Sequence, residues 1–273
     1  MIRTFILIVS LVAIPVCAAD DQEAAPRPSK AESAKQAVGR ELRHYGQEAK
    51  TLATAPLHWD KKEWERFAEG TGAVVAVYAV DRRLYDAVQR NRSGFTNDFA
   101  KVVTPFGGQR AIDLSALLLA GGFFAHDGRM RDAGRDSLEA ELWAGGVVTP
   151  LLKRLFGRAR PVQEQGSHSF QPFSSSQSFP SGHATNVFAF ATGIAAHYDG
   201  WVVPTIVYSI AGGVAFSRVN DRAHFPSDVL AGALIGRVVA KGIVHLHEVG
   251  RNHVSIVPTI IDRHPAIALH WSR

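Results

Sequence analysis

From Trp59 to Glu248 the chain is a succession of apolar segments, rich in Ala, Leu and Gly, that short polar breaks separate. Most segments are too long for ordinary β-strands, and their apolar residues recur at helical spacing. This pattern predicts an all-α fold, in which successive helices form an antiparallel bundle because their connections are short. The expected helices cover residues 60–69, 72–90, 94–104, 111–125, 134–156, 182–198, 201–217 and 226–248.

The first 19 residues have the pattern of a targeting segment. A positive start at Arg3 precedes an apolar run over 5–16, and small residues follow at 17–19. This order is typical of a cleaved secretory signal peptide, which predicts a periplasmic or secreted protein. An uncleaved membrane anchor and lipid attachment at Cys17 are the alternatives.

The remaining chain divides into three parts. Residues 20–57 are rich in Ala, Gln, Glu, Lys and Pro, which predicts a linker followed by a solvated helix. Residues 58–250 form the expected helical domain. In the tail, 251–273, two β-branched or alternating runs flank a turn-like segment at 262–265, and they predict a short β-hairpin.

The composition excludes several classes of protein. Hydrophobic residues make up 46% of the chain, which excludes a fully disordered protein. Cys17 is the single cysteine, so an internal disulfide framework and a cysteine-rich zinc site are excluded. The net charge of +5 is modest and both signs are mixed along the chain, so nucleic acid is not an expected partner.

No apolar segment reaches the roughly 20 uncharged residues that a membrane-spanning helix needs. The segment that comes nearest to this length is 201–217, which Arg218 follows directly. The sequence therefore favours a soluble bundle. Association with a membrane surface stays open, and the cell membrane is the alternative location.

Three polar patches stand apart from the apolar segments. The first, 153–161, contains four cations and closes the expected helix 134–156. The second, Pro180-Ser181-Gly182-His183, opens the helix that follows. The third runs from Arg218 at one helix end to His224 and Asp228 at the next helix start. In an antiparallel bundle, the end of one helix and the start of the next lie at the same end of the bundle. The three patches are therefore expected to converge.

The converging side chains predict a site for a phosphoryl group. Lys153, Arg160 and Arg218 would repel one another in an empty pocket, and a phosphoryl dianion would neutralise most of their charge. The Ser181 hydroxyl and the first amides of the following helix add donors for the same anion. Carboxylates are scarce here, so neither a metal nor another cofactor is expected.

The remaining residues supply a mechanism. A histidine that a carboxylate orients can attack phosphorus, and a second histidine can protonate the departing oxygen. His224 with Asp228 is the expected nucleophile pair, because four residues along a helix bring two side chains together. His183, among cations at a helix start, is expected to have a lowered pKa and to act as the general acid.

Taken together, the motifs resemble the signature of the type 2 phosphatidic acid phosphatase and vanadium haloperoxidase superfamily. Its three parts are matched in order by Lys153 and, after six intervening residues, Arg160-Pro161; by Pro180 to His183; and by Ser217-Arg218 with His224 and Asp228. The motifs span 153–228, and the helical pattern extends the likeness to about 60–248.

The resemblance implies a metal-independent phosphatase that hydrolyses phosphate monoesters or diphosphates through a phosphohistidine on His224. The substrate would be a lipid phosphate or a small soluble ester, and Asp228 would orient the nucleophile while His183 acts as acid. The phosphate would be bound by Lys153, Arg160, Ser181, Gly182 and Arg218. A vanadate-dependent haloperoxidase and a non-catalytic phosphate-binding protein are the alternatives.

Two neighbouring features qualify this expectation. Pro150 lies inside the helix that delivers Lys153, and it should kink that helix or end a run of hydrogen bonds. The segment 162–179 joins two patches and is long enough to be a lid, although a passive connector is equally compatible. Its Phe170, Phe173 and Phe179 either touch an apolar substrate tail or simply pack.

Overall fold

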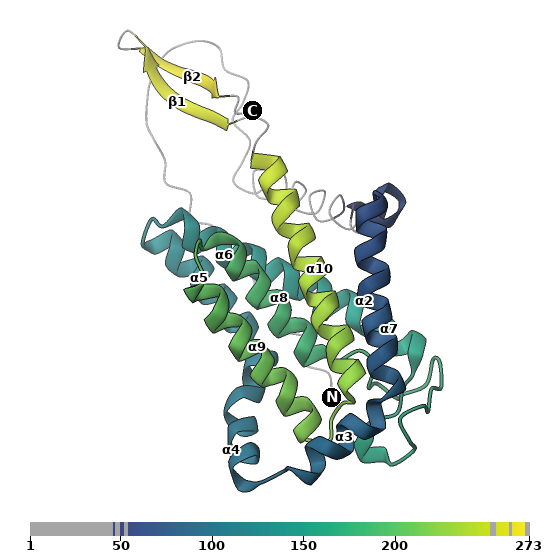
Figure 1. Cartoon of the computed structure of the whole chain (residues 1–273). Helices are drawn as coiled ribbons and strands as arrows, with labels where there is room; N and C mark the ends of the chain where they lie inside the picture. Colours follow the sequence, from purple (N-terminus) through teal and green to yellow (C-terminus); the bar gives the residue numbers. More distant parts are fainter. Residues whose placement is uncertain (1–45, 47–49, 52–53, 252–254, 262–263, 271–273) are drawn as a thin grey trace. The chain divides into compact units, whose positions relative to one another are not determined.

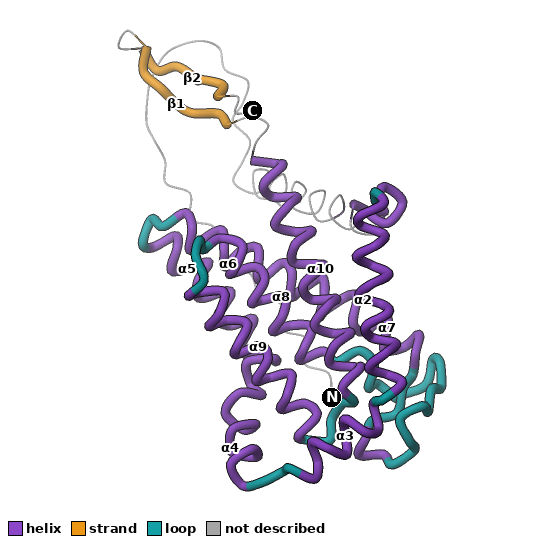
Figure 2. Tube along the Cα trace, in the orientation of Figure 1, coloured by secondary structure: helices purple, strands orange, loops and turns teal. Residues whose placement is uncertain are grey.

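The computed structural model of the chain describes residues 46, 50–51, 54–251, 255–261 and 264–270. The predicted signal peptide at 1–19 lies outside these residues, as does most of the predicted linker at 20–57. Between residues 54 and 251 every regular element is a helix, so the all-α class is confirmed for this part of the chain (Figures 1 and 2).

The longer helices follow one another with short connections. They are α2 (Lys61–Ala79), α3 (Asp81–Arg90), α4 (Gly94–Val103), α5 (Gln109–Phe124), α6 (Gly128–Glu141), α7 (Thr149–Phe156), α8 (Gly182–His197), α9 (Val202–Asn220) and α10 (Pro226–Arg251). Shorter helical segments are η1 (Ala55–His58), η2 (Thr104–Gly107), the π-helical η3 (Leu142–Val148) and η4 (Pro161–Gln163).

Helix α8 is the centre of the bundle, and α6, α9 and α10 pack against it (Figure 2). The packing uses small side chains: Ala184, Ala189 and Ala191 of α8 are buried. On α10, Gly232 and Gly236 face α8 so closely that a Cβ atom at either would collide with its backbone. One glycine per helical turn therefore lets α10 approach the helix that begins with the second sequence patch.

Three predicted helix boundaries are wrong. The expected single helix over 72–90 is broken at Val80, between the end of α2 and the start of α3. The expected break at 70–71 is absent, because α2 continues through it from a capping box between Asp60 and Glu63. The expected single helix over 134–156 is interrupted by η3. Pro150 then stands in the first turn of α7, directly after the π-helical η3, so the break in hydrogen bonding expected at this proline coincides with the change from π- to α-helix; Lys153 lies in the last turn of α7.

A polar cluster joins the helices at the end remote from the sequence patches. The buried Asp136 of α6 accepts from His197 Nε2 of α8 at 2.7 Å and from His247 Nδ1 of α10 at 2.6 Å. Three helices thus share one buried carboxylate. The contacts fix the mutual position of α6, α8 and α10 far from the patches.

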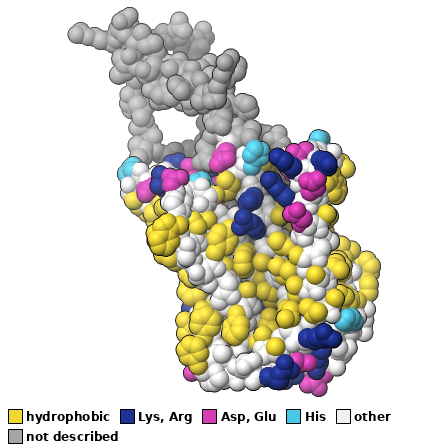
Figure 3. Space-filling view, viewed as in Figure 1, with side chains coloured by type: hydrophobic (Ala, Val, Ile, Leu, Met, Phe, Trp, Pro, Cys, Tyr) yellow, Lys and Arg dark blue, Asp and Glu magenta, His cyan; other side chains and the backbone are white. Residues whose placement is uncertain are grey.

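Large apolar side chains are exposed over much of the described surface. They include Val75 on α2, Phe95 on α4, Phe124 on α5, Ile206 on α9 and Val238 on α10. Figure 3 shows apolar side chains across the middle of one face and charged ones mainly toward its two ends. Helix α9 and residues 226–248 of α10 are long and apolar enough to cross a membrane. Such a surface weighs against the soluble bundle that the sequence favours.

Two strands follow the helices. β1 (Ser255–Ile261) pairs antiparallel with β2 (His264–His270), and Val257 lies opposite Ala268. Residues 262–263 between the strands lie outside the described residues. The C-terminal hairpin as a whole therefore stays a prediction.

Candidate active site

Lys153 and Arg160 come from the end of α7 and the segment just after it. Gly157 ends α7 in the left-handed conformation, at φ 55°, and turns the chain so that Arg160 stands beside Lys153. Lys153 Nζ donates to the backbone carbonyl of Gln177 at 2.5 Å. Burial, with the nearby Arg160 charge, lowers the pKa of Lys153 to about 8. In the described part of the chain, neither cation has a carboxylate within ion-pair distance.

The start of α8 supplies uncharged donors. Ser181 is the N-cap, and its hydroxyl oxygen accepts from the Ala184 amide at 3.5 Å. Gly182 is the first helical residue, so its N–H has no acceptor within the helix. A Cβ atom at Gly182 would lie 3.9 Å from Lys153 Cε. The lysine side chain therefore passes directly beside the open end of α8.

His183 lies one residue further along α8, among the cations. Burial lowers its pKa to about 4, and the charges of Arg218, His224, Arg160 and Lys153 act in the same direction. The chain after η2 packs against the ring: a Cβ atom at Gly108 would lie 3.5 Å from His183 Nε2. This environment thus keeps the imidazole neutral at neutral pH.

Arg218 lies in the last turn of α9 and is largely buried. One terminal nitrogen donates to Asp221 Oδ2 at 2.5 Å and to Thr104 Oγ1 at 3.3 Å. Its Nε is buried without a hydrogen-bond partner in the structure. A buried guanidinium N–H left unpaired costs free energy, and an anion in the pocket would satisfy it.

His224 and Asp228 stand at the junction of α9 and α10. The His224 amide donates to the Arg218 carbonyl at 3.1 Å, which ties the two residues together. His224 Nδ1 lies 3.7 Å from Asp228 Oδ2, and that oxygen accepts from Ser178 Oγ at 2.6 Å and from the Phe225 amide at 2.8 Å. Burial lowers the pKa of His224, although Asp228 opposes the shift.

The structure brings all eight sequence-predicted site residues to one end of the bundle. One detail of the prediction is wrong: His224 is not on a helix with Asp228, because α10 begins only at Pro226. Their approach depends instead on the turn before α10, in which Asp228 Oδ2 accepts from the Phe225 amide. The catalytic and binding roles of the eight residues stay predictions.

Sequence reasoning missed several residues that contact the site. Arg158 donates to Asp228 Oδ1 at 2.6 Å, Ser178 donates to Asp228 Oδ2, and Thr104 and Asp221 hold Arg218. Arg158 was visible as one of four cations in the first patch. Thr104 gave no signal, because it is more than a hundred residues away in the chain from Arg218.

The segment 162–179 is bound to the end of α7 rather than free. Backbone amides of Gln171, Phe173 and Ser178 donate to carbonyls of Gly157, Arg154 and Arg158. This packing fixes the segment beside the site, which is unlike a loose lid.

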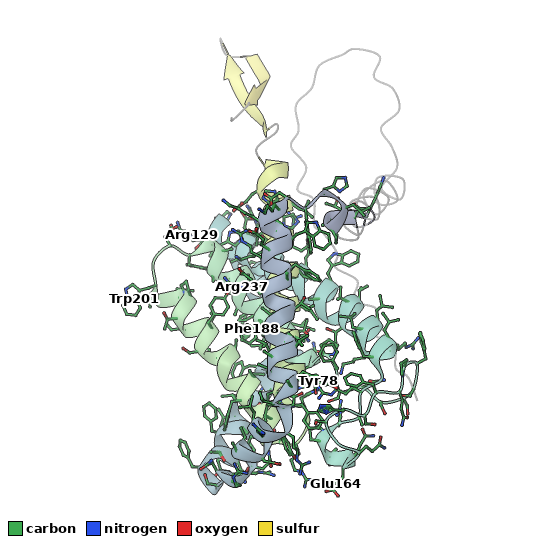
Figure 4. The ribbon with its side chains drawn as sticks, turned by 45° about the vertical axis from the view of Figure 1, so that its right-hand side comes forward. Tyr78, Arg129, Glu164, Phe188, Trp201 and Arg237 are labelled. Atoms are coloured by element: carbon green, nitrogen blue, oxygen red, sulfur yellow. The ribbon has the colours of Figure 1, made fainter. Side chains whose placement is uncertain are left out.

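Part of the same segment walls an apolar groove of about 550 Å³. Phe170 and Phe179 line it together with Tyr78 of α2, which is labelled in Figure 4, and Phe156 of α7; the Phe170 ring contacts Tyr78 and the Phe179 ring contacts Phe156. Phe173 does not take part, since 78% of it is exposed. The groove reaches Ser227, the neighbour of Asp228, so an apolar surface lies next to the polar site.

Among the residues that the structure describes, no group of three or more His, Cys, Asp or Glu side chains is arranged to hold a metal ion.

Comparison with known proteins places these observations in context. Residues 140–251 match the model of the PAP2 superfamily. Over 96 residues the chain is 44% identical to the lipid A 1-phosphatase of Rhizobium etli, covering 33% of this chain and 40% of that protein. Over 91 residues it is 33% identical to the putative undecaprenyl-diphosphatase YbjG of Escherichia coli, covering 33% of this chain and 46% of that protein. The chain thus spans less than half the length of these curated relatives.

A solved structure shares the fold. The transmembrane PAP2-type phosphatidylglycerolphosphate phosphatase of Bacillus subtilis superposes with a TM-score of 0.52 and 24% sequence identity. The superposition covers 66% of this chain and 95% of that one.

Proposed function

Because residues 140–251 match the model of the PAP2 superfamily, we propose that the chain is a phosphatase that hydrolyses a phosphate ester or diphosphate of a membrane lipid. One observation carries the proposal: Lys153, Arg160 and Arg218 surround two histidines and the open start of α8. The Nε of Arg218 is unpaired, and burial together with the Arg160 charge lowers the pKa of Lys153; both are expected of cations that line a buried anion-binding pocket.

The mechanism follows from the places of the histidines. Nδ1 of His224 faces Asp228, which leaves Nε2 to attack phosphorus. As the N–P bond forms, the bond from phosphorus to the leaving oxygen breaks, and His183 gives that oxygen a proton. Water then attacks the phosphohistidine, with His183 taking its proton, and releases phosphate and free His224.

Positive charge for the transition state comes from side chains in this mechanism. Lys153, Arg160 and Arg218 can neutralise the non-bridging oxygens, and the Gly182 amide and Ser181 hydroxyl can add hydrogen bonds. No step requires a metal ion. The His183 proton is available because a bound phosphoryl dianion raises the pKa of His183, which burial and the surrounding cations otherwise lower to about 4.

Three features support a lipid substrate. The apolar groove lies beside the site, exposed apolar side chains cover the flanks of the bundle, and the curated relatives are named for lipid A and undecaprenyl diphosphate. With α9 and α10 spanning a bilayer, the site at the helix ends lies at the level of lipid headgroups. We therefore propose the cell membrane as the location, in place of a soluble periplasmic protein.

The test is phosphate release by the full chain in detergent or lipid nanodiscs. Substrates are a lipid A 1-phosphate, a polyprenyl diphosphate and phosphatidate, with an aryl phosphate as the soluble comparison. We expect faster release from at least one lipid, unchanged by a chelator and abolished in His224→Gln. Preference for the aryl phosphate would contradict the lipid substrate, and strict dependence on a divalent metal would contradict the mechanism.

The same preparation distinguishes the two alternative functions. Phosphate binding without turnover of any ester would indicate a binding protein. Halide oxidation by peroxide after loading with vanadate would indicate a haloperoxidase.

A further inference from the structure

Arg158 is completely buried, and all five of its N–H groups are used. Nε and one terminal nitrogen donate to the Ser167 carbonyl. That nitrogen also donates to Asp81 Oδ2 at 2.7 Å, and the other donates to Ser227 Oγ at 2.8 Å and Asp228 Oδ1 at 2.6 Å. A guanidinium with every donor engaged has one orientation, and so has each group that it holds.

The two carboxylates that Arg158 joins are also fully buried. Asp81 begins α3 and accepts in addition from the Ser227 amide at 2.8 Å. Asp228 stands in the first turn of α10. Burying three charges is costly unless geometry and hydrogen bonding are nearly complete, as they are here. The single positive charge of Arg158 is shared between Asp81 and Asp228. Arg158 therefore neutralises Asp228 only in part, and Asp228 can still interact with other groups.

Aromatic rings enclose the guanidinium. Its Cζ lies 4.5 Å from the ring centre of Phe225, 5.2 Å from that of Tyr78 and 5.3 Å from that of Phe170. These rings come from the turn before α10, from α2 and from the segment after α7. The cage excludes water from the Arg158–Asp228 pair, which strengthens its electrostatic effect.

We propose that Arg158 is a positioning residue: it clamps Asp228 against Asp81 and thereby sets the orientation and basicity of His224. The proposal rests on the proposed function, since it concerns the nucleophile of that reaction. With Oδ1 held by Arg158, Asp228 directs Oδ2 toward His224 Nδ1. Arg158 belongs to no position of the three sequence motifs, and it is not among the residues expected to bind phosphate.

Other charged groups also face His224 and must be held constant. They are Lys153 of α7, Arg160 after it, His183 of α8 and Asp228 of α10. None of these is altered in the variants below. A change in the pKa of His224 is then due to the substitution at Arg158 or Asp81.

The test measures the titration of His224 directly. The full chain carries isotope-labelled histidine, and the His224 signal is assigned by its loss in His224→Gln. Arg158→Gln removes the positive charge from Asp228, so the apparent pKa of His224 should rise. Asp81→Asn leaves Arg158 wholly to Asp228, so the pKa should fall. Arg154→Gln, which removes an exposed cation four residues before Arg158, should leave it unchanged.

Opposite shifts from two neighbouring buried variants are what a clamp requires and what a packing defect does not produce. If Arg158→Gln does not fold, the expected fall in the His224 pKa in Asp81→Asn tests the proposal by itself. Shifts in the same direction, or none in folded protein, would overturn the proposal. This measurement needs no turnover, so inactivity of the wild-type protein on every lipid would count against the proposed function only.

Kinetics give the second readout. Arg158→Lys keeps the charge but has three donors in place of five, so it should preserve the pKa of His224 more nearly than Arg158→Gln does. It should still lower kcat on the order of 10- to 100-fold, because the carboxylate is misplaced. KM should change less than kcat, since Arg158 does not reach the phosphate pocket. A loss confined to KM would instead make Arg158 a substrate-binding residue.

Discussion

Nδ1 of His224 lies 3.7 Å from Oδ2 of Asp228, which is close enough for an ion pair and too long for a hydrogen bond. The Ser178 hydroxyl lies beside both atoms: it donates to Asp228 Oδ2 at 2.6 Å and is 3.5 Å from His224 Nδ1. The carboxylate is therefore fixed before any substrate binds. We expect the gap to close when positive charge develops on His224 during attack on phosphorus.

Asp228→Asn should test this relationship. The amide cannot stabilise the cation that forms on His224, so we expect kcat to fall by about 10³- to 10⁴-fold, as when the carboxylate of a catalytic triad is made neutral. Affinity for inorganic phosphate should stay within a few-fold, because Asp228 does not face the anion. Single-turnover kinetics and calorimetric phosphate binding measure the two quantities. Unchanged kcat in folded protein would contradict the orienting role.

His183→Ala should separate substrates by leaving group. An alkoxide from a lipid needs a proton, whereas a nitrophenolate leaves without one, so the lipid rate should fall by about 10²- to 10⁴-fold and the aryl rate far less. In the wild-type protein the lipid rate should decline as pH rises and His183 deprotonates in the complex. That decline should vanish in the variant. Equal losses on both substrates would exclude His183 as the acid.

Lys153 predicts the pH dependence of phosphate binding. Burial lowers its pKa to about 8, so Lys153 loses its charge as pH rises through 8 rather than through the usual value of lysine. Binding requires the charged form, so phosphate affinity should decrease above pH 8, approaching tenfold per pH unit. Lys153→Met should bind more weakly below pH 8 and show no such decrease. Calorimetry from pH 6 to 10 measures both curves, and a wild-type curve flat to pH 10 would contradict the prediction.

The contrast between predicted and observed features has a physical cause. The alternation of helix starts and ends was enough to place Lys153, His183 and Arg218 together, because local periodicity determines helices and short loops determine their direction. The contact of Arg158 with Asp81 joins residues 77 positions apart, and periodicity carries no information about such a pair. The soluble bundle was favoured because a charge count per segment does not show which apolar side chains face outward.

Gly157→Ala should destabilise the protein and weaken the site. Residue 157 has φ 55°, and a Cβ atom there would collide with the Gln171 carbonyl, so we expect a loss of more than about 1 kcal/mol in unfolding free energy. The loss should include activity, since Gly157 leads directly into Arg158. Gly72→Ala is the control: it lies within α2 with open space around it and should be neutral or stabilising. Denaturant unfolding compares the two, and equal stabilities would contradict the predicted strain.

Ile206→Lys should decide whether α9 faces lipid. Ile206 is the fifth residue of α9 and 55% exposed, and a lysine there would be harmless on a protein surrounded by water. Inside a bilayer it costs up to about 3 kcal/mol, so membrane-inserted protein should decrease while the protein made is unchanged. Trp201→Lys is the matched control, because Trp201 stands at the start of α9, where a charge can reach the lipid headgroups (Figure 4). Membrane fractionation with carbonate washing measures insertion. If both variants stay in the membrane fraction to the same extent as the wild type, α9 does not span the bilayer and the site serves a protein bound at most to the membrane surface.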